Sequence, residues 1–190
     1  MKKIIIVFFL LAACMHIQAQ DLTWDINFQK GRDLESVPVS QIIRMQTGEI
    51  FQFSVLPSSN AYCYIVCYDS QRNVAVLFNQ LLSAKQEKIF GPLEITEPAG
   101  TETIYVILSL DRQTNLDRLI LELNNNPGSR QAGNNLYREV VSVQNNVSRL
   151  GEPASSYIPS GGTTRGNTAP QHITRFSGKD LYVRAIAIRH

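Results

Sequence analysis

The fold is decided by the stretch Tyr62-Cys-Tyr-Ile-Val-Cys-Tyr68, which consists of aromatic, β-branched and small apolar residues. Residues of these types favour β-strands. Because neither face of this strand is polar, we expect it to lie inside a sheet that is covered on both sides. The stretch therefore predicts a layered fold built around a buried strand.

The same stretch contains Cys63 and Cys67. On an extended strand, residues four positions apart share one face and lie about 13 Å from each other. A disulfide requires Cα atoms within roughly 7 Å. We therefore expect two small buried thiols here, and neither a disulfide nor a metal or redox pair.

Other strand patterns lie on both sides of this stretch. Apolar and polar residues alternate over 22–28 and again over 49–55, a pattern typical of half-buried strands. Further strands are predicted at 74–78, 88–93, 101–108, 172–177 and 181–188. Four of the apolar side chains are expected to be fully buried, namely Phe53, Val66, Ile104 and Val106.

Two helices are predicted between residues 114 and 150. Over 114–123, apolar residues recur every three or four positions, and Thr114 and Asp117 resemble an N-terminal cap. A second apolar stripe runs over 133–150 and is followed by glycine. Because each helix has one apolar face, we expect both to pack on the side of the sheet.

Together these elements predict an α+β fold that is mostly β. We expect a single domain over 20–190 with an antiparallel sandwich-like or curled sheet, in which a helical pair (114–150) is inserted before the C-terminal hairpin. Residues 151–171 are rich in Gly, Pro and Ser and are predicted to form a long, mobile loop that faces a partner. Its candidate contact residues are Tyr157, Ile158 and Arg165.

Residues 1–19 have the pattern of a secretory signal peptide. Two lysines precede the apolar run 4–13, which is too short to cross a bilayer as a helix. Two processing routes are open: cleavage after Ala19, or lipidation of Cys14, which ends a lipobox-like Leu-Ala-Ala-Cys sequence. We expect an exported protein that is periplasmic or extracellular, and that is membrane-anchored only if Cys14 is lipidated.

The charge of the domain argues against nucleic acid as a partner. Removing residues 1–19 lowers the formal net charge from +2 to zero, because this segment carries two lysines and no acidic residue. A neutral domain lacks the cationic field that attracts nucleic acid or anionic lipid. An envelope protein or a surface ligand is therefore the expected kind of partner.

The sequence holds no strong catalytic motif. A hydrolase needs a nucleophile, a base and an orienting acid in contact. His172 with Ser155, Ser156, Ser160 or Ser177, near the Gly-rich loop, is one combination, but no Gly-x-Ser-x-Gly sequence accompanies it. We expect a non-enzymatic binding or envelope-associated module without cofactor or metal, and a secreted hydrolase that uses His172 is the alternative.

Two further expectations concern single side chains. Tyr62, Tyr64 and Tyr68 share one strand face, where they either line the core or form a stacking platform for a sugar or peptide. Core packing is the favoured interpretation. His190, at the end of the chain, is expected to be exposed to solvent.

A series of motifs over residues 48–109 resembles one bacterial family. The motifs are Gly48-Glu-Ile-Phe-Gln-Phe53, Ala61-Tyr-Cys-Tyr-Ile-Val66, Val76-Leu-Phe78 and, most specifically, Pro98-Ala-Gly-Thr-Glu102. They are similar to the family called domain of unknown function 4384, although Asn79 stands where that family usually has proline. The resemblance implies an accessory or recognition role beside peptidase, kinase or envelope modules, and no catalytic residues. Glu102 is expected to fix its turn by accepting hydrogen bonds from backbone amides.

Overall fold

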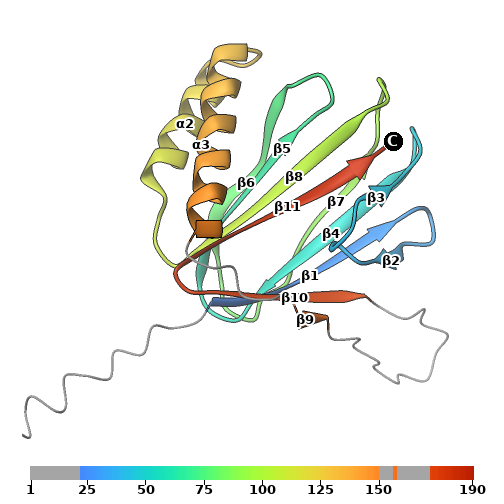
Figure 1. Ribbon diagram of the computed structural model, residues 1–190, viewed down its shortest axis with the longest axis horizontal. Coiled ribbons are helices and arrows are strands. Elements are labelled where there is room, and N and C mark those ends of the chain that lie inside the picture. The colour runs from blue at the N-terminus through green and yellow to red at the C-terminus, as the bar shows by residue number, and fades with distance from the viewer. Residues whose placement is uncertain (1–21, 150–155, 158–171) are drawn as a thin grey trace, which may run out of the picture.

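The computed structural model describes residues 22–149, 156–157 and 172–190. Two sheets face each other, and two helices lie on the outer side of one of them (Figure 1). The elements, in chain order, are β1 (Leu22–Lys30), β2 (Glu35–Val37), β3 (Ile43–Arg44), β4 (Ile50–Pro57), β5 (Ala61–Tyr68), β6 (Val74–Leu82), β7 (Lys88–Glu94), β8 (Thr101–Ser109), α2 (Thr114–Asn125), α3 (Arg130–Arg149), β9 (Ser156–Tyr157), β10 (Ile173–Gly178) and β11 (Leu181–Arg189). The expected α+β, mostly β fold is confirmed.

The strands form two sheets that are almost entirely antiparallel. Sheet A has the order β7-β4-β1-β10-β9, with β2 also beside β1, and sheet B has the order β3-β11-β8-β5-β6. All pairs are antiparallel except β3 with β11. Strand β5 lies between β6 and β8, with one face toward sheet A and the other toward the helices, as its apolar sequence predicts.

Two separate hydrophobic cores result from this layering. The core between the sheets includes Trp24, Phe28, Ile65 and Phe176. The core under the helices is built from side chains of β5, β8 and β11 against the apolar faces of α2 and α3. The four side chains expected to be fully buried are at most 2% exposed, which confirms that expectation.

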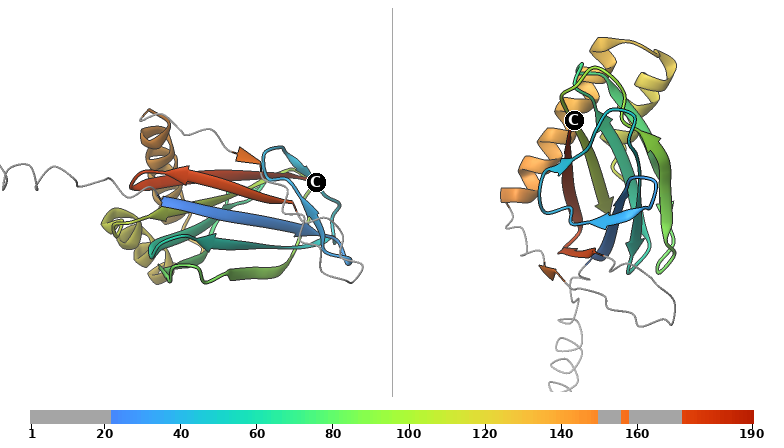
Figure 2. Two further views of the ribbon diagram at one scale, coloured as in Figure 1. Left: turned by 90° about the horizontal axis from the view of Figure 1, so that it is seen from below. Right: turned by 90° about the vertical axis from the view of Figure 1, so that its right-hand side faces the viewer.

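Helices α2 and α3 lie side by side on the outer face of sheet B (Figure 2). Both occur where the apolar stripes predict them. The predicted cap is wrong, because Gln113 occupies the N-cap position and its side chain makes no capping hydrogen bond. Asp117 instead pairs with Arg112, and the Gln113 backbone N–H donates to Tyr64 Oη at 3.0 Å. The hydrogen bond to Tyr64 of β5 therefore fixes the position at which α2 starts.

Among the strands that precede the helices, three differ from the prediction. Strands β2 and β3 are two or three residues long and lie in the stretch between β1 and β4, for which no strand is predicted. Strand β6 continues to Leu82, four residues beyond its predicted end. No helix in the described part of the chain is long and apolar enough to span a membrane.

Candidate functional site

The residues proposed to contact a partner are only partly described. Ser156–Tyr157 form strand β9, which pairs with β10 so that Tyr157 lies opposite Thr174. This short strand interrupts the predicted loop. Ile158, Arg165 and Cys14 lie outside the described residues, as does the segment 1–19.

His172 lies just before β10. Its backbone N–H donates to Ser36 Oγ at 2.8 Å. Ser177 is separated from it by more than about 13 Å, because Ile173 and Ser177 alone are four positions apart on an extended strand. Ser177 therefore lies too far along β10 to act with His172. Of the other proposed serines, Ser156 is in β9 and the rest lie outside the described residues.

The expectation that His190 is exposed is wrong. Its side chain is 0% exposed, although it belongs to the last residue of the chain. The cause is backbone pairing: the His190 N–H donates to the Gly100 carbonyl, and the Gly100 N–H donates to the His190 carbonyl, each at 3.0 Å. These two bonds extend the ladder between β8 and β11, and they carry the imidazole ring inward.

The ring of His190 meets the side chain of Glu102. The distance between His190 Nε2 and Glu102 Oε1 is 3.5 Å, and neither ring nitrogen has a hydrogen-bond partner. Glu102 thus contacts the C-terminal residue rather than the backbone amides of its own turn. The same turn is held from the other side, since Ser70 Oγ donates to the Pro98 carbonyl at 3.1 Å.

Burial dominates the electrostatics of this end of sheet B. It raises the pKa of Glu102, an effect that His190 opposes and Asp69 reinforces. Burial also raises the pKa of Cys67 to about 12, and the nearby Glu102 adds to the rise. The Cys67 thiol is therefore protonated at neutral pH and is a poor nucleophile. Within the described residues, no three His, Cys, Asp or Glu side chains are grouped to hold a metal ion.

The raised pKa of Glu102 gives a testable pH dependence. A carboxyl whose pKa is raised by folding contributes stability below its unfolded pKa, and this contribution is lost as the pH rises through the folded pKa. From about pH 4 to about pH 7, the wild type should therefore lose stability relative to Glu102→Gln. Denaturant unfolding of both proteins at each pH measures the difference.

A control separates Glu102 from its neighbour. The same comparison made in a His190→Asn background should keep the sign of the pH effect, because burial is its main cause. A stability difference that does not change with pH would contradict the assignment.

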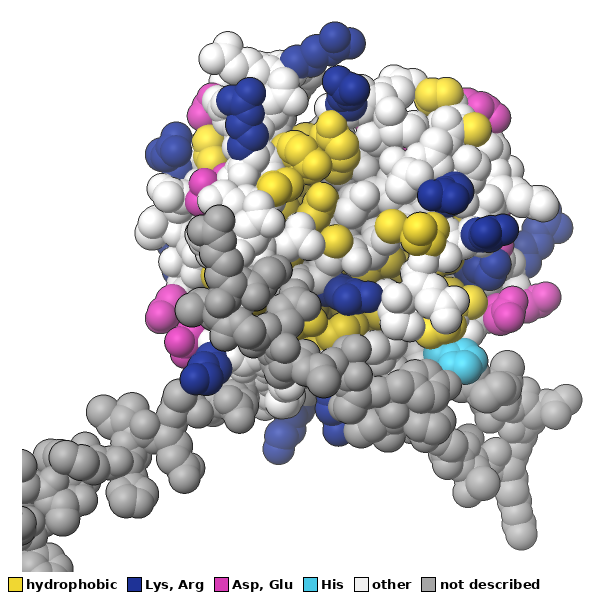
Figure 3. Space-filling view, in the orientation of Figure 1, with side chains coloured by type: hydrophobic (Ala, Val, Ile, Leu, Met, Phe, Trp, Pro, Cys, Tyr) yellow, Lys and Arg dark blue, Asp and Glu magenta, His cyan; other side chains and the backbone are white. Residues whose placement is uncertain are grey.

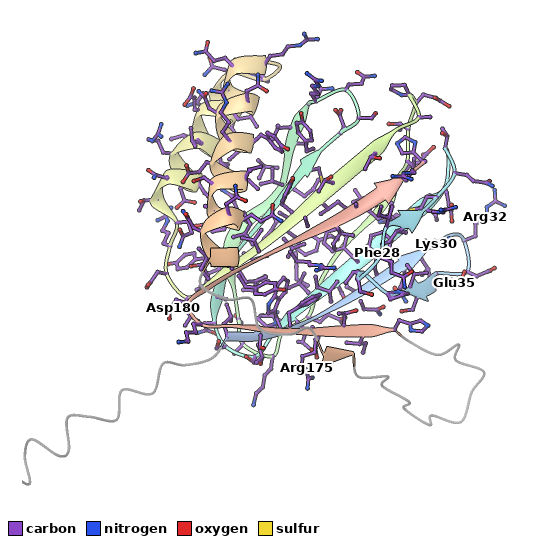
Figure 4. All side chains as sticks on the ribbon, in the orientation of Figure 1. Phe28, Lys30, Arg32, Glu35, Arg175 and Asp180 are labelled. Carbon is purple, nitrogen blue, oxygen red and sulfur yellow. The ribbon has the colours of Figure 1, made fainter. Side chains whose placement is uncertain are left out.

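Two open grooves are lined by charged residues. One, of about 350 Å³, lies between the β1–β2 turn, with Arg32, and the segment 46–50. The other, of about 340 Å³, lies beside Lys85 and Arg175. Arg175 is already engaged, because its guanidinium donates two hydrogen bonds of 2.7 Å to the carboxylate of Asp25. Figure 4 places Arg32 at the β1–β2 turn, far from Arg175 on β10, so the two grooves do not form one site.

The tyrosines of β5 pack on the core, which agrees with the favoured interpretation. Tyr64 is 1% exposed. Tyr68 stacks on Tyr137 of α3, with ring centroids 4.0 Å apart and planes 13° apart, and Tyr105 meets the same ring edge-on. Figure 3 shows apolar side chains gathered between α3 and the neighbouring strands. The contacts of Tyr137 with Tyr68 and Tyr105 therefore pack α3 against sheet B.

The edges of the two sheets differ sharply in how they are protected. Natural proteins blunt sheet edges with very short strands, charged side chains or proline. Strands β3 and β9 are two residues long, and β7 carries Lys88, Pro92 and Glu94. Strand β6, by contrast, has nine residues, Val-Ala-Val-Leu-Phe-Asn-Gln-Leu-Leu, none of which is charged, proline or glycine. Among the described strands at sheet edges, β6 alone is long and without these protective residues.

The second half of β6 pairs regularly with β5, after one register shift in the first half. The pairing with β5 shifts register at Leu77, so that Phe78–Leu82 forms a continuous ladder with Ala61–Ile65. We call Phe78–Leu82 the β6 edge. Leu81 is 54% exposed there, and Asn79 and Gln80 are also exposed. The β6 edge therefore offers free backbone groups next to an exposed apolar side chain.

Comparison with protein-family models, with curated proteins and with solved structures finds no match to this chain. The resemblance of residues 48–109 to the family described above therefore stays a prediction. Its most specific motif, which begins at Pro98, has a clear structural position, because it holds Gly100 and Glu102 against the C-terminal residue.

Proposed function

We propose that this chain is an exported, non-enzymatic binding module that takes up an extended segment of another polypeptide as an added strand on the β6 edge. The observation that carries the proposal is the contrast among the sheet edges: the others are short or bear charges and proline, and β6 is long and uncharged. Strand addition uses backbone hydrogen bonds for affinity and alternate side chains for specificity.

Side chains around the β6 edge favour an apolar strand. Leu81 lies opposite Tyr62 of β5, which is only partly buried, so an added strand would cover both. On the other face, the ammonium group of Lys88 lies over the Phe78 ring, with Nζ 5.6 Å from the ring centre. This contact holds the Lys88 charge over Phe78. Covering about half of one leucine stabilises a complex by roughly 1 kcal/mol.

Export and the absence of catalysis are parts of the same proposal. Export rests on the signal-like pattern of residues 1–19, with a lipid anchor if Cys14 is modified. A binding role agrees with the protonated thiol of Cys67 and with the distance between His172 and Ser177. It also agrees with the recognition role that the family resemblance implies.

Site-specific photo-crosslinking tests the binding proposal. A photoreactive amino acid at Gln80 should give a covalent adduct with a polypeptide in the cells that produce the protein. The same amino acid at Arg32, which is exposed at the β1–β2 turn, should give none (Figure 4).

A matched pair of variants gives the control. Leu81→Lys should remove the Gln80 adduct, because a charge on the edge opposes strand pairing. Leu121→Lys should leave it, since Leu121 is similarly exposed, at 59%, but lies on α2. The absence of any adduct at Gln80, or an adduct that persists in Leu81→Lys, would refute the proposed function.

A further inference from the structure

We infer that the guanidinium group of Arg184 binds the carboxylate of a small organic acid, on the side of the sandwich where β10 and β11 diverge. This site is distinct from the β6 edge, because β8 and β5 lie between β11 and β6 in sheet B. The inference goes beyond the proposed function and does not depend on it.

Arg184 points into the space between the two sheets. On β11 its side chain shares a face with Tyr182 and Ile186, which belong to the core between the sheets. Its guanidinium carbon lies 5.4 Å from the centre of the Phe176 ring of β10. Its other neighbour, Val39, is 2% exposed and belongs to the same core. A charged group therefore lies against an apolar core.

This charge has no carboxylate beside it in the part of the chain that the structure describes, where the ion pairs involve other residues. Nη2 of Arg184 donates a hydrogen bond of 2.8 Å to the Val39 carbonyl, and the buried Nε has no hydrogen-bond partner. Buried charges in proteins are paired as a rule, because removing an ion from water is costly. Arg184 thus lacks the anionic partner that its surroundings require.

Arg175 has the arrangement that Arg184 lacks. It is exposed, and its guanidinium donates two hydrogen bonds to the Asp25 carboxylate. A guanidinium presents its N–H groups in a fixed fork that matches the two oxygens of a carboxylate. The exposed arginine of β10 is therefore paired within the chain, and the arginine that faces the core is left for a ligand.

A second polar group without a partner lies close to the first. Thr174 is two positions from Phe176 on the same inner face of β10 and is 3% exposed, and its Oγ1 has no hydrogen-bond partner. Thr174 lies four positions before Gly178 and Arg184 three positions after Leu181, so both are similarly far from the turn that joins β10 to β11. We therefore assign the Thr174 hydroxyl to the site as a second donor.

Access from this side favours a small ligand. Strands β10 and β11 are joined by a turn and diverge along their length (Figure 1). Arg184 as a whole is partly exposed, although its Nε is buried. Figure 3 views this side and shows a basic side chain among apolar ones between β11 and β10. A small molecule can carry a carboxylate to a guanidinium between two sheets, which the folded surface of another protein cannot follow.

Benzoate is the probe, and benzamide is its uncharged control of nearly the same shape. At constant ionic strength, benzoate should raise the midpoint of thermal unfolding of the purified protein with increasing concentration, and benzamide should not. Benzoate should also shift the Nε–H resonance of Arg184 in a proton–nitrogen correlation spectrum. That resonance is assigned by its loss in Arg184→Met.

Variants locate the site. Arg184→Met removes the charge and should raise the dissociation constant of benzoate at least about tenfold. Arg184→Lys keeps the charge and a donor for the Val39 carbonyl but lacks the planar fork, so it should weaken binding about threefold. Thr174→Val removes only the hydroxyl and should also weaken binding about threefold. Arg189→Met, an exposed position on the same strand, is the matched control and should bind benzoate as the wild type does.

The inference fails if benzoate neither stabilises the wild type nor shifts the Arg184 resonance, if benzamide stabilises it equally, or if Arg184→Met and the wild type bind benzoate equally. If Arg184→Met does not fold, the wild-type spectrum and the Arg184→Lys variant decide the question. Leu81→Lys should leave benzoate binding unchanged, so the two proposals are tested separately. Loss of the Gln80 adduct bears on the proposed function alone, and loss of benzoate binding bears on this site alone.

Discussion

Trp24→Ala is expected to lower the free energy of unfolding by about 3–5 kcal/mol. Trp24 is 1% exposed, and its ring lies 5.2 Å from that of Phe176 and 5.1 Å from that of Tyr182. Phe176 belongs to sheet A and Tyr182 to sheet B, so this one ring joins the two sheets. Denaturant unfolding followed by circular dichroism measures the loss, since the variant has no tryptophan left for fluorescence.

Trp24→Phe is the matched control. The indole N–H of Trp24 is buried without a hydrogen-bond partner. Phenylalanine removes this unsatisfied donor and keeps an aromatic ring, so the cost should be clearly smaller than for alanine. A loss below about 1 kcal/mol in Trp24→Ala would contradict the role of this ring in joining the sheets.

Gly91→Ala is expected to destabilise the protein by at least about 2 kcal/mol. Gly91 has a φ of +127°, a conformation that residues with a Cβ rarely adopt. An added Cβ would also lie 2.8 Å from Gln52 Cβ and 2.9 Å from the Phe51 carbonyl oxygen of β4. Because that obstacle includes backbone, β7 would have to move away from its neighbour.

Gly48→Ala separates these two causes. Gly48 also has a positive φ, +82°, but nothing lies within 4 Å of its added Cβ. Its cost should reflect backbone strain alone, about 1–2 kcal/mol, and should be smaller than that of Gly91→Ala. Equal costs in the same unfolding measurement would mean that the approach of β4 to β7 has no energetic effect.

The sequence predicts those elements whose pattern is local. In β1 the burial alternates residue by residue, as its apolar and polar side chains do, and the two helical stripes are equally regular. Strands β2 and β3 have no such pattern, because they form only by pairing with β1 and β11. The burial of His190 is not predictable for the same reason, since it depends on Gly100, ninety positions earlier in the chain.

The candidate site illustrates the same limit. The predicted end of β6 precedes Asn79 and Gln80, because two adjacent polar residues resemble a turn. The useful signal is a different one: nine successive residues without charge, proline or glycine. Composition reveals such a stretch, but only the strand order places it at a sheet edge, so the sequence alone could not separate a binding edge from a buried strand.

The position of β10 has a consequence for how the molecule assembles. Strand β1 pairs with β10, and the ion pair between Asp25 and Arg175 joins residues 150 positions apart. Contacts of such long sequence separation form late and slow the folding of a chain. In a nascent chain that has not yet reached residue 172, β1 can pair with β4 but not with β10, and β8 can pair with β5 but not with β11. Such a chain leaves Trp24 without Phe176 and Tyr182, so neither sheet can close over the core until β10 and β11 have been synthesised.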